Sequence, residues 1–224
     1  MKHILWDWNG TLLDDIDAEV GSLNAMLTKR GREPVTVEFF REHFAFPARR
    51  FYQLVGMDVP DSEWDALAQE YHDTYHSLPY GLNRDAFAAL ELVRAEGAGQ
   101  SVISALHQRF LDEETAGLGV ARYMDYVYGT DNLDGGSKLA RARELLSRLV
   151  RSGSDAIVLI GDSIHDFEVA RDLGVACVLY SGGSHSRARL EPFAPVGDTL
   201  EECVRIACAT WARGSGGCTV PSRM

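Results

Sequence analysis

The feature that most constrains this fold is an unbroken apolar segment at residues 156–160, which stops abruptly at Gly161-Asp162-Ser163. A run of this kind, bounded by polar turn residues, is typical of a buried strand. Beyond residue 81, similar short runs alternate with longer segments that repeat apolar residues at helical spacing. Because alternating strands and helices require a parallel sheet with helices on both faces, the sequence predicts an α/β fold with a Rossmann-like, doubly wound core.

The individual elements can be located from the same patterns. Strands are predicted at residues 4–6, 101–104, 126–128, 156–160 and 175–180. Helices are predicted at residues 84–96, 107–117, 137–150 and 167–173. The last of these helices precedes Gly174, which suits a helix end because glycine adopts left-handed backbone conformations readily.

The segment at residues 15–80 contains no strand-like run. Its first apolar residues recur at steps of four, three and four, which predicts an amphipathic helix that ends at Gly31. These residues are Ile16, Val20, Leu23 and Leu27. We therefore expect an all-helical insertion at 15–80 within a core formed by 1–14 and 81–212. The Gly- and Ser-containing tail at 213–224 is predicted to be disordered.

Charge and hydropathy exclude several classes of function. The chain carries 33 acidic and 22 basic residues, a formal net charge of −11, so phosphate backbones would repel it and no nucleic-acid partner is expected. No apolar run approaches the ~20 residues of a membrane-spanning helix. The N-terminus lacks the apolar core of a secretory signal. We expect a soluble cytoplasmic protein, monomeric or homodimeric, that does not bind membranes.

Polar residues follow the predicted strands at the edge where such sheets bind ligands. Asp7 and Asn9 follow the first strand, Ser104 ends the second, and Asp162 follows the strand at 156–160. Lys138 lies at the start of a predicted helix. Two carboxylates on adjacent strand ends suit magnesium, whereas a hydroxyl and an ammonium suit phosphate oxygens. Each residue alone is more often structural, but their joint order indicates a site in which a carboxylate can attack phosphorus.

The same residues resemble the motifs of the haloacid dehalogenase-like hydrolases. Residues 7–14, D-W-N-G-T-L-L-D, resemble the first motif, D-x-D-G-T-L-x-D, and residues 102–104 look like the second, an apolar strand that ends in Ser or Thr. Lys138 occupies the place of the third-motif lysine, and residues 161–166, G-D-S-I-H-D, resemble the fourth, G-D-S/T-x-x-D. The helical insertion is similar to the small cap of the phosphoglycolate phosphatase and β-phosphoglucomutase branch.

This resemblance implies a magnesium-dependent phosphatase that acts on a small phosphorylated metabolite through an aspartyl-phosphate intermediate. Asp7 would be the nucleophile and a magnesium ligand. The backbone carbonyl of Asn9 and the carboxylate of Asp162 would be the other protein ligands of the metal.

The resemblance also assigns the residues that would bind the phosphoryl group. Ser104, together with its neighbour Ala105, would contact the phosphoryl oxygens, and Lys138 would stabilise Asp7 and the developing charge. Asp166 would support Lys138 or a metal-bound water. Each role matches the chemistry of the side chain concerned.

Asn9 departs from the family pattern, because the phosphatases of the family carry a general acid/base Asp there. An amide cannot transfer a proton at neutral pH, and such a group typically contributes ~10²–10⁴-fold. Turnover could therefore be slow, or restricted to good leaving groups such as acyl phosphates. His107 or His165 could supply the proton instead, and His107 is the better candidate because it closely follows the second motif. Alternatively, the protein binds a phosphorylated ligand in a regulatory role without turning it over.

The predicted cap offers few residues that could select a substrate. Arg49 or Arg50 could contact a carboxylate or a second phosphate, although two exposed arginines at a helix start explain them equally well. A phosphonate hydrolase is a further alternative, because such enzymes pair a small residue at position 9 with a cap lysine. Lys29 is the one lysine in the predicted cap.

Overall fold

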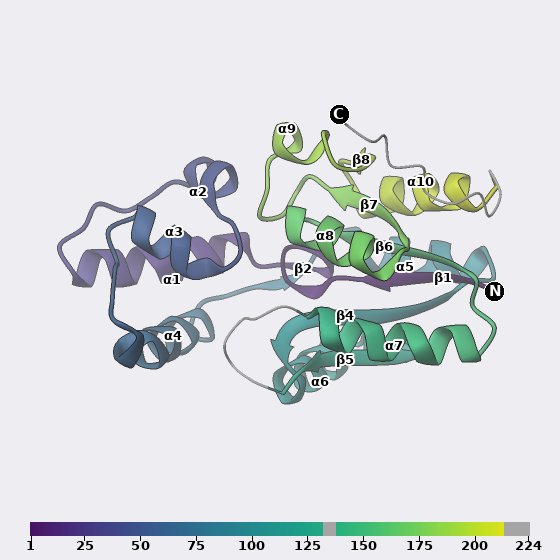
Figure 1. The fold of residues 1–224 in the computed structure, drawn as a ribbon, viewed down its shortest axis with the longest axis horizontal. Coiled ribbons are helices and arrows are strands. Elements are labelled where there is room, and N and C mark those ends of the chain that lie inside the picture. The colour runs from purple at the N-terminus through teal and green to yellow at the C-terminus, as the bar shows by residue number, and fades with distance from the viewer. Residues whose placement is uncertain (132–137, 213–224) are drawn as a thin grey trace.

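The computed structural model describes residues 1–131 and 138–212, so the predicted tail at 213–224 lies outside the described residues. Six parallel strands form a sheet in the order β5-β4-β1-β6-β7-β8, with helices on both of its faces (Figure 1). A helical domain projects from one end of the sheet. The predicted α/β fold is therefore confirmed. None of the described helices combines the length and the apolar character that crossing a bilayer requires.

The strands of the sheet are β1 (Lys2–Trp6), β4 (Gly99–His107), β5 (Tyr126–Thr130), β6 (Ala156–Gly161), β7 (Ala176–Tyr180) and β8 (Val196–Gly197). The helices around it are α5 (Ala86–Ala95), α6 (Gln108–Gly117), the short turn η2 (Ala121–Tyr123), α7 (Leu139–Arg151), α8 (Ile164–Leu173), α9 (Arg187–Leu190) and α10 (Leu200–Ala212). The sequence patterns did not predict η2, α9, β8 or α10.

Alternating side chains of the central strands divide the core into two apolar layers. Ile4 and Trp6 of β1 point into a layer with residues of α5 and α10, whereas Leu5 points into a layer with residues of α7 and α8. This alternation follows from the period of two in a strand. All three side chains are fully buried, which explains why the strand reads as a continuous apolar run rather than as an alternating one.

The position of β1 between β4 and β6 brings the site residues together. Trp6 is in register with Val102 of β4 and with Ile160 of β6. The backbone N–H of Asp7 donates to the carbonyl of Ile160 at 2.9 Å, which extends the pairing by one residue. Because all three strands run in the same direction, the polar residues that follow them meet at one edge of the sheet.

A helical domain is inserted after β1. It contains α1 (Ile16–Lys29), α2 (Val37–His43), α3 (Ala48–Leu54) and α4 (Asp61–Tyr75), and it has its own apolar cluster around Leu23, Phe40 and Phe51. The chain enters this domain through β2 (Leu13–Asp14) and leaves through β3 (Gly81–Leu82). These two strands pair antiparallel, so the two connections lie side by side. Two-residue strands carry no periodicity, which is why no pattern predicted them.

Backbone carbonyls and cationic side chains hold this helical domain, hereafter the cap, against the core. Arg41 of α2 donates to the carbonyls of Gly182 and Gly183, at 2.7 and 2.9 Å, in the loop that follows β7. In the opposite direction, Arg189 donates to the carbonyls of Arg41 and Phe44 at 2.5 and 3.0 Å. These contacts place the cap over the carboxyl ends of the strands.

Candidate active site

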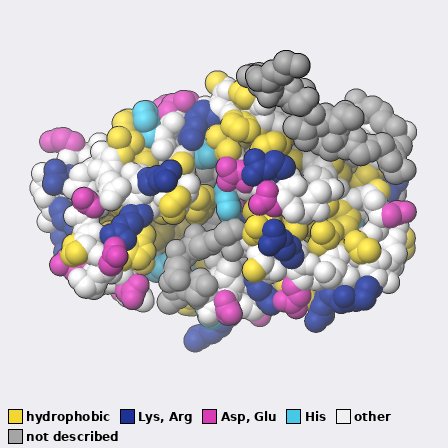
Figure 2. Space-filling model, in the orientation of Figure 1, with side chains coloured by type: hydrophobic (Ala, Val, Ile, Leu, Met, Phe, Trp, Pro, Cys, Tyr) yellow, Lys and Arg dark blue, Asp and Glu magenta, His cyan; other side chains and the backbone are white. Residues whose placement is uncertain are grey.

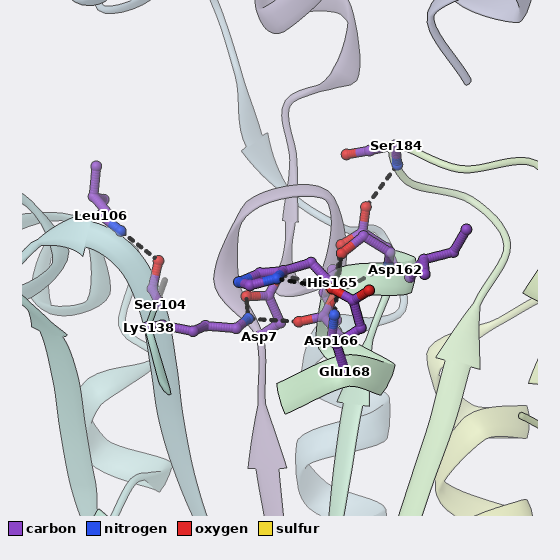
Figure 3. A network of polar contacts seen from close by, with 12 residues as sticks. Asp7, Ser104, Leu106, Lys138, Asp162, His165, Asp166, Glu168 and Ser184 are labelled. Atoms are coloured by element: carbon purple, nitrogen blue, oxygen red, sulfur yellow. Dashed lines mark hydrogen bonds and ion pairs between the residues drawn. The ribbon is translucent and has the colours of Figure 1, made fainter. Parts of the chain in front are cut away.

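Lys138, immediately before α7, places its ammonium group between two buried carboxylates (Figure 3). Its Nζ donates a hydrogen bond to Asp7 Oδ1 and another, of 2.5 Å, to Asp166 Oδ1. Asp7 follows β1 directly, and Asp166 lies in the first turn of α8. An ammonium removed from water must be paired, so this triad ties together the ends of three separate elements.

The pKa values in this triad follow from burial and from the neighbouring charges. Burial alone lowers the pKa of Lys138, but the charges of Asp166 and Asp7 outweigh this and raise it above its ordinary value. Burial opposes the ionisation of Asp166, yet Lys138 holds that pKa below its usual range. Burial, and then the charge of Asp166, raise the pKa of Asp7 well above its usual value. A cation beside Asp7 would therefore favour its ionised form.

Asp162, directly after β6, adds a third carboxylate. Its Oδ1 accepts from the hydroxyl of Thr11 at 3.1 Å and its Oδ2 from the backbone N–H of Ser184 at 2.6 Å. Oxygen atoms of Asp7, Asp162 and Asp166 lie within 4.8 Å of one another. Burial, then the charge of Asp166, raise the pKa of Asp162 to about 6. Clustered carboxylates that lack balancing positive charge suit a hard divalent cation, so the residues present fit magnesium.

Two glycines make room for these carboxylates. A Cβ atom on Gly10, where φ is +70°, would lie 2.4 Å from Asp162 Oδ2, and one on Gly161 would lie 2.2 Å from Asp166 Cγ. Ser163 begins α8 with a capping box, in which its hydroxyl accepts from the Asp166 N–H while Asp166 Oδ2 accepts from the Ser163 N–H. The G-D-S-x-x-D pattern thus combines close approach, a carboxylate and a helix start.

Ser104 and Ala105, near the end of β4, line the same pocket as the carboxylates. The buried Ser104 hydroxyl accepts a hydrogen bond of 3.0 Å from the backbone N–H of Leu106. Figure 3 shows Ser104 on the β4 side of the site, away from Asp162. With its oxygen occupied as an acceptor, the hydroxyl can still donate its hydrogen to a phosphoryl oxygen.

The Asn9 side chain is turned toward Asp15, which directly precedes the first cap helix, and toward Tyr75 at the end of α4. Its Nδ2 donates to Asp15 Oδ2 at 2.8 Å and lies 3.2 Å from the hydroxyl of Tyr75, which itself donates to Asp15 at 2.6 Å. Asp15 also accepts from the Gly10 N–H at 2.7 Å. Because the two amide hydrogens of Asn9 have acceptors in Asp15 and Tyr75, the side chain has no donor left for a ligand in the pocket.

Glu19, one turn along α1 from Asp15, also lines the pocket. The enclosed Oε2 atom of its carboxyl has no hydrogen-bond partner among the described residues. Burial raises the pKa of Glu19 well above its usual value, and the charges of Asp15, Asp162 and Asp7 add to the shift. This carboxyl therefore resists ionisation in the metal-free protein.

The rest of the pocket wall comes mainly from the cap and is aromatic. The aromatic lining residues are Phe40, Phe44, Phe46, Phe51, Tyr52, Trp64, Tyr71 and Tyr75. Figure 2 shows hydrophobic side chains gathered where the cap meets the core on the face turned to the viewer. Carboxylates and an ammonium thus form the floor of the pocket, and rings form its walls.

The two histidines considered as proton donors occupy different environments. His165 lines the pocket, its enclosed Nε2 has no partner among the described residues, and burial lowers its pKa. His107 precedes α6, where its Nδ1 accepts a hydrogen bond from the Arg109 N–H, and it is not among the described lining residues. Of the two, His165 is the one placed beside the carboxylates.

The three cap cations proposed to contact a substrate point elsewhere. Arg49 pairs with Asp61 at 2.5 Å and donates to a backbone carbonyl within the cap, Arg50 is exposed, and Lys29 pairs with Glu70 at 3.0 Å. None of the three belongs to the pocket lining in the described parts of the chain.

Sequence patterns missed several residues that line or support the site: Thr11, Asp15, Glu19, Tyr75 and Ser184. For Glu19 a signal existed, because a carboxylate falls within the apolar stripe of the first cap helix. The other residues reach the site through contacts distant in sequence. Taken together, the carboxylates, the ammonium and the hydroxyl at the strand ends of a capped parallel sheet are the groups expected of an enzyme site for a metal-bound phosphate group.

Comparison with known proteins agrees with this class. Residues 4–180 match the family model of the haloacid dehalogenase-like hydrolases. The chain is 25% identical to a phosphoglycolate phosphatase of Pseudomonas fluorescens, over 83% of this chain and 72% of the relative. It is 28% identical to a 5'-nucleotidase of Pseudomonas aeruginosa, over 86% and 88%. The crystal structure of a phosphatase predicted in Clostridium acetobutylicum superposes with a TM-score of 0.77 at 18% identity, over 93% and 98%.

The chain therefore belongs to the haloacid dehalogenase-like hydrolases. The expected relationship to the phosphoglycolate phosphatase branch and the expectation of a hydrolase are both confirmed. Enzymes of this family generally use a divalent metal ion, and the clustered carboxylates fit one.

We expect Glu19→Gln to stabilise the metal-free protein by at least about 1 kcal/mol near neutral pH. The folded state raises the Glu19 pKa, so wild type loses stability as pH rises from the unfolded pKa toward the folded one, and the variant does not. Urea unfolding with a chelator should show a larger gain at about pH 8 than at about pH 4. Asp17→Asn, exposed on the same helix, is the control. A gain in stability that does not change with pH would contradict a raised pKa of Glu19 in the folded protein.

Gly161→Ala should destabilise the protein by about 1–3 kcal/mol, because the new Cβ would overlap the Asp166 side chain. Gly117→Ala is the matched control, since no atom lies within 4 Å of its Cβ position. The midpoints of urea unfolding for the two variants measure the difference. Equal midpoints would show that Asp166 can move aside without cost.

Proposed function

We propose that this protein is a magnesium-dependent phosphatase, a phosphoric monoester hydrolase that acts on a small phosphorylated metabolite through an aspartyl-phosphate intermediate. The observation that carries the proposal is the position of the Asp7 carboxylate. It lies beside the Lys138 ammonium and within 4.8 Å of Asp162, at the floor of a pocket that Ser104 also lines. A nucleophile, a cation site and phosphate-binding groups thus converge on one point.

The carboxylates of Asp7 and Asp162, with the backbone carbonyl of Asn9, would hold the magnesium ion. A bound magnesium ion supplies positive charge that draws the phosphoryl oxygens toward the nucleophile and offsets their repulsion. Asp166 is better suited to a positioning role, because its two oxygens already accept from Lys138 and from Ser163.

In the first step a carboxylate oxygen of Asp7 attacks phosphorus, and the bond from phosphorus to the leaving oxygen breaks. The leaving oxygen keeps the electron pair and takes up a proton. Water then cleaves the aspartyl-phosphate, which releases inorganic phosphate and restores Asp7. Lys138 and Ser104 would bind the phosphoryl oxygens in both steps, while Asp166 holds Lys138 in place.

Among the described residues, the site lacks an evident donor for the proton that the leaving oxygen takes up. The amide hydrogens of Asn9 are donated to Asp15 and Tyr75, so Asn9 has no donor left for the leaving oxygen. Two routes remain within the proposal: a leaving group of low basicity, or His165 as the proton donor. The competing proposal, a regulatory protein that binds a phosphorylated ligand without turnover, rests on Asn9 alone.

The relatives support phosphate esters in general rather than one substrate, because their names cover phosphoglycolate, N-acetylmuramic acid 6-phosphate and nucleotide phosphatases. Phosphonate cleavage has less support, because Lys29 pairs with Glu70. A cytoplasmic location and a monomeric or homodimeric state stay part of this proposal.

Phosphate release from a panel of alkyl, aryl and acyl phosphates tests the proposal. Wild type should release phosphate only with magnesium, and Asp7→Asn should reduce the rate at least ~10³-fold because the nucleophile is lost. Asp65→Asn, exposed on α4, should match wild type. Release by Asp7→Asn at the wild-type rate would rule out the aspartyl-phosphate route.

Asn9→Asp should raise turnover of alkyl phosphates by ~10²–10⁴-fold if chemistry limits the rate. The new carboxyl would stand beside Asp15, where Asn9 Nδ2 now lies 2.8 Å from Oδ2, and two such carboxyls share a proton at neutral pH. Steady-state kinetics of wild type and variant on the same ester measure the gain. No phosphate release by wild type or by the variant would favour the regulatory alternative.

A further inference from the structure

The wall of the active-site pocket suggests which part of a substrate it receives. Phe44 and Phe46 pack edge to face at 5.2 Å, and Phe46 reaches across from the cap to His165 of the core at 5.0 Å. Tyr52 and Trp64 form another such pair at 5.6 Å. All of these rings line the pocket that opens above Asp7. Flat apolar walls of this kind favour a ring, because paired aromatic groups gain contact beyond simple burial.

Positive charge in this pocket is confined to its floor. Among residues 1–131 and 138–212, Lys138 is the one lysine or arginine in the lining, and Asp7 and Asp166 already pair with it. The acidic groups of the lining, which include Glu19 and Asp162, add no positive charge. A second anionic group on the substrate, beyond its phosphate, would therefore find no further lysine or arginine among the described lining residues to pair with.

The arginines near the cap are committed to other partners. Arg41 and Arg189 donate to backbone carbonyls that join cap and core. The Arg49 guanidinium lies over the Trp64 ring at 5.5 Å and pairs with Asp61. Lys and Arg side chains do stand around the junction of cap and core in Figure 2, but apart from Lys138 none of those in the described chain belongs to the lining.

We infer that the substrate is a phosphate monoester whose remaining part is uncharged and aromatic, and that carboxylate-bearing phosphates are disfavoured. This inference rests on the proposed phosphatase function for the position of the phosphoryl group. The phosphate would lie at Asp7 and Ser104. The ring would lie between Phe46 and the other aromatic side chains of the cap that line the pocket. The selectivity comes from apolar contact in the cap together with the lack of a second cation.

A binding experiment isolates the inference from turnover. With magnesium present, isothermal calorimetry compares three non-hydrolysable probes: 2-phenylethylphosphonate, ethylphosphonate and phosphonoacetate. The aromatic probe should bind about tenfold more tightly than ethylphosphonate, a difference typical of one well-placed ring. Phosphonoacetate should bind more weakly than either.

Two phenylalanine variants provide a matched pair. Phe46 and Phe87 are similarly exposed, at 37% and 40%, but only Phe46 belongs to the pocket lining. Phe46→Ala should reduce the preference for the aromatic probe by about three- to tenfold while ethylphosphonate affinity stays constant. Phe87→Ala should leave the preference unchanged. Loss of the preference in both variants equally would overturn the role of Phe46.

Two results would overturn the inference itself. Phosphonoacetate binding as tightly as the aromatic probe would show that a second anion is accepted. Equal affinity for 2-cyclohexylethylphosphonate would show that the pocket selects apolar bulk rather than an aromatic ring. These results can be distinguished from failure of the proposed function. If the protein is not a phosphatase, no ester will release phosphate, but the order of the probe affinities will still be as inferred.

Discussion

The structure depends on one buried ammonium group. Lys138 lies between Asp7 and Asp166, and each of the three residues stands at the end or the start of a different element. A charge enclosed by protein is tolerated only when its partners are close and themselves held by hydrogen bonds. That requirement explains Gly161, which leaves room for Asp166, and Ser163, which holds the same carboxyl at the start of α8. The triad thus joins the end of β1 to the starts of α7 and α8 and fixes the position of the Asp7 carboxylate.

The same triad leaves the site short of positive charge. Burial first, and then repulsion between neighbouring carboxylates, raise the pKa values of Asp7, Asp162 and Glu19, so each of these groups resists ionisation. A divalent cation would relieve this repulsion and prepare the floor for a phosphate group. One ammonium and one metal ion would suit a single phosphate, and the described lining offers no further lysine or arginine for a second anion.

The cap gives the pocket a different character from its floor. Its rings form apolar walls, and the contacts of Arg41 and Arg189 with backbone carbonyls set their position relative to the core. Asn9 links the two regions, because its amide nitrogen contacts Asp15 and Tyr75 instead of facing the phosphoryl site. Under the proposed mechanism, an amide at this position would not transfer a proton, whereas the backbone carbonyl of residue 9 would still be present as a metal ligand.

Local patterns in the sequence were sufficient to predict five of the six strands of the sheet, all but β8, and the polar residues that follow them. The strand predicted at 156–160 and the glycine after the helix at 167–173 were correct because a single short segment carries the whole signal. The sequence also predicted that Asp7 and Asp162 would meet, since parallel neighbouring strands end at one edge.

Only the tertiary structure decided which cap side chains face that edge. Arg49 was a plausible substrate contact and pairs with Asp61 instead, whereas Glu19 turns into the pocket. Tyr75 reaches Asp15 across 60 positions of sequence. The side of a helix that faces a site depends on how the helix packs, and packing is set by contacts between segments that no local pattern contains.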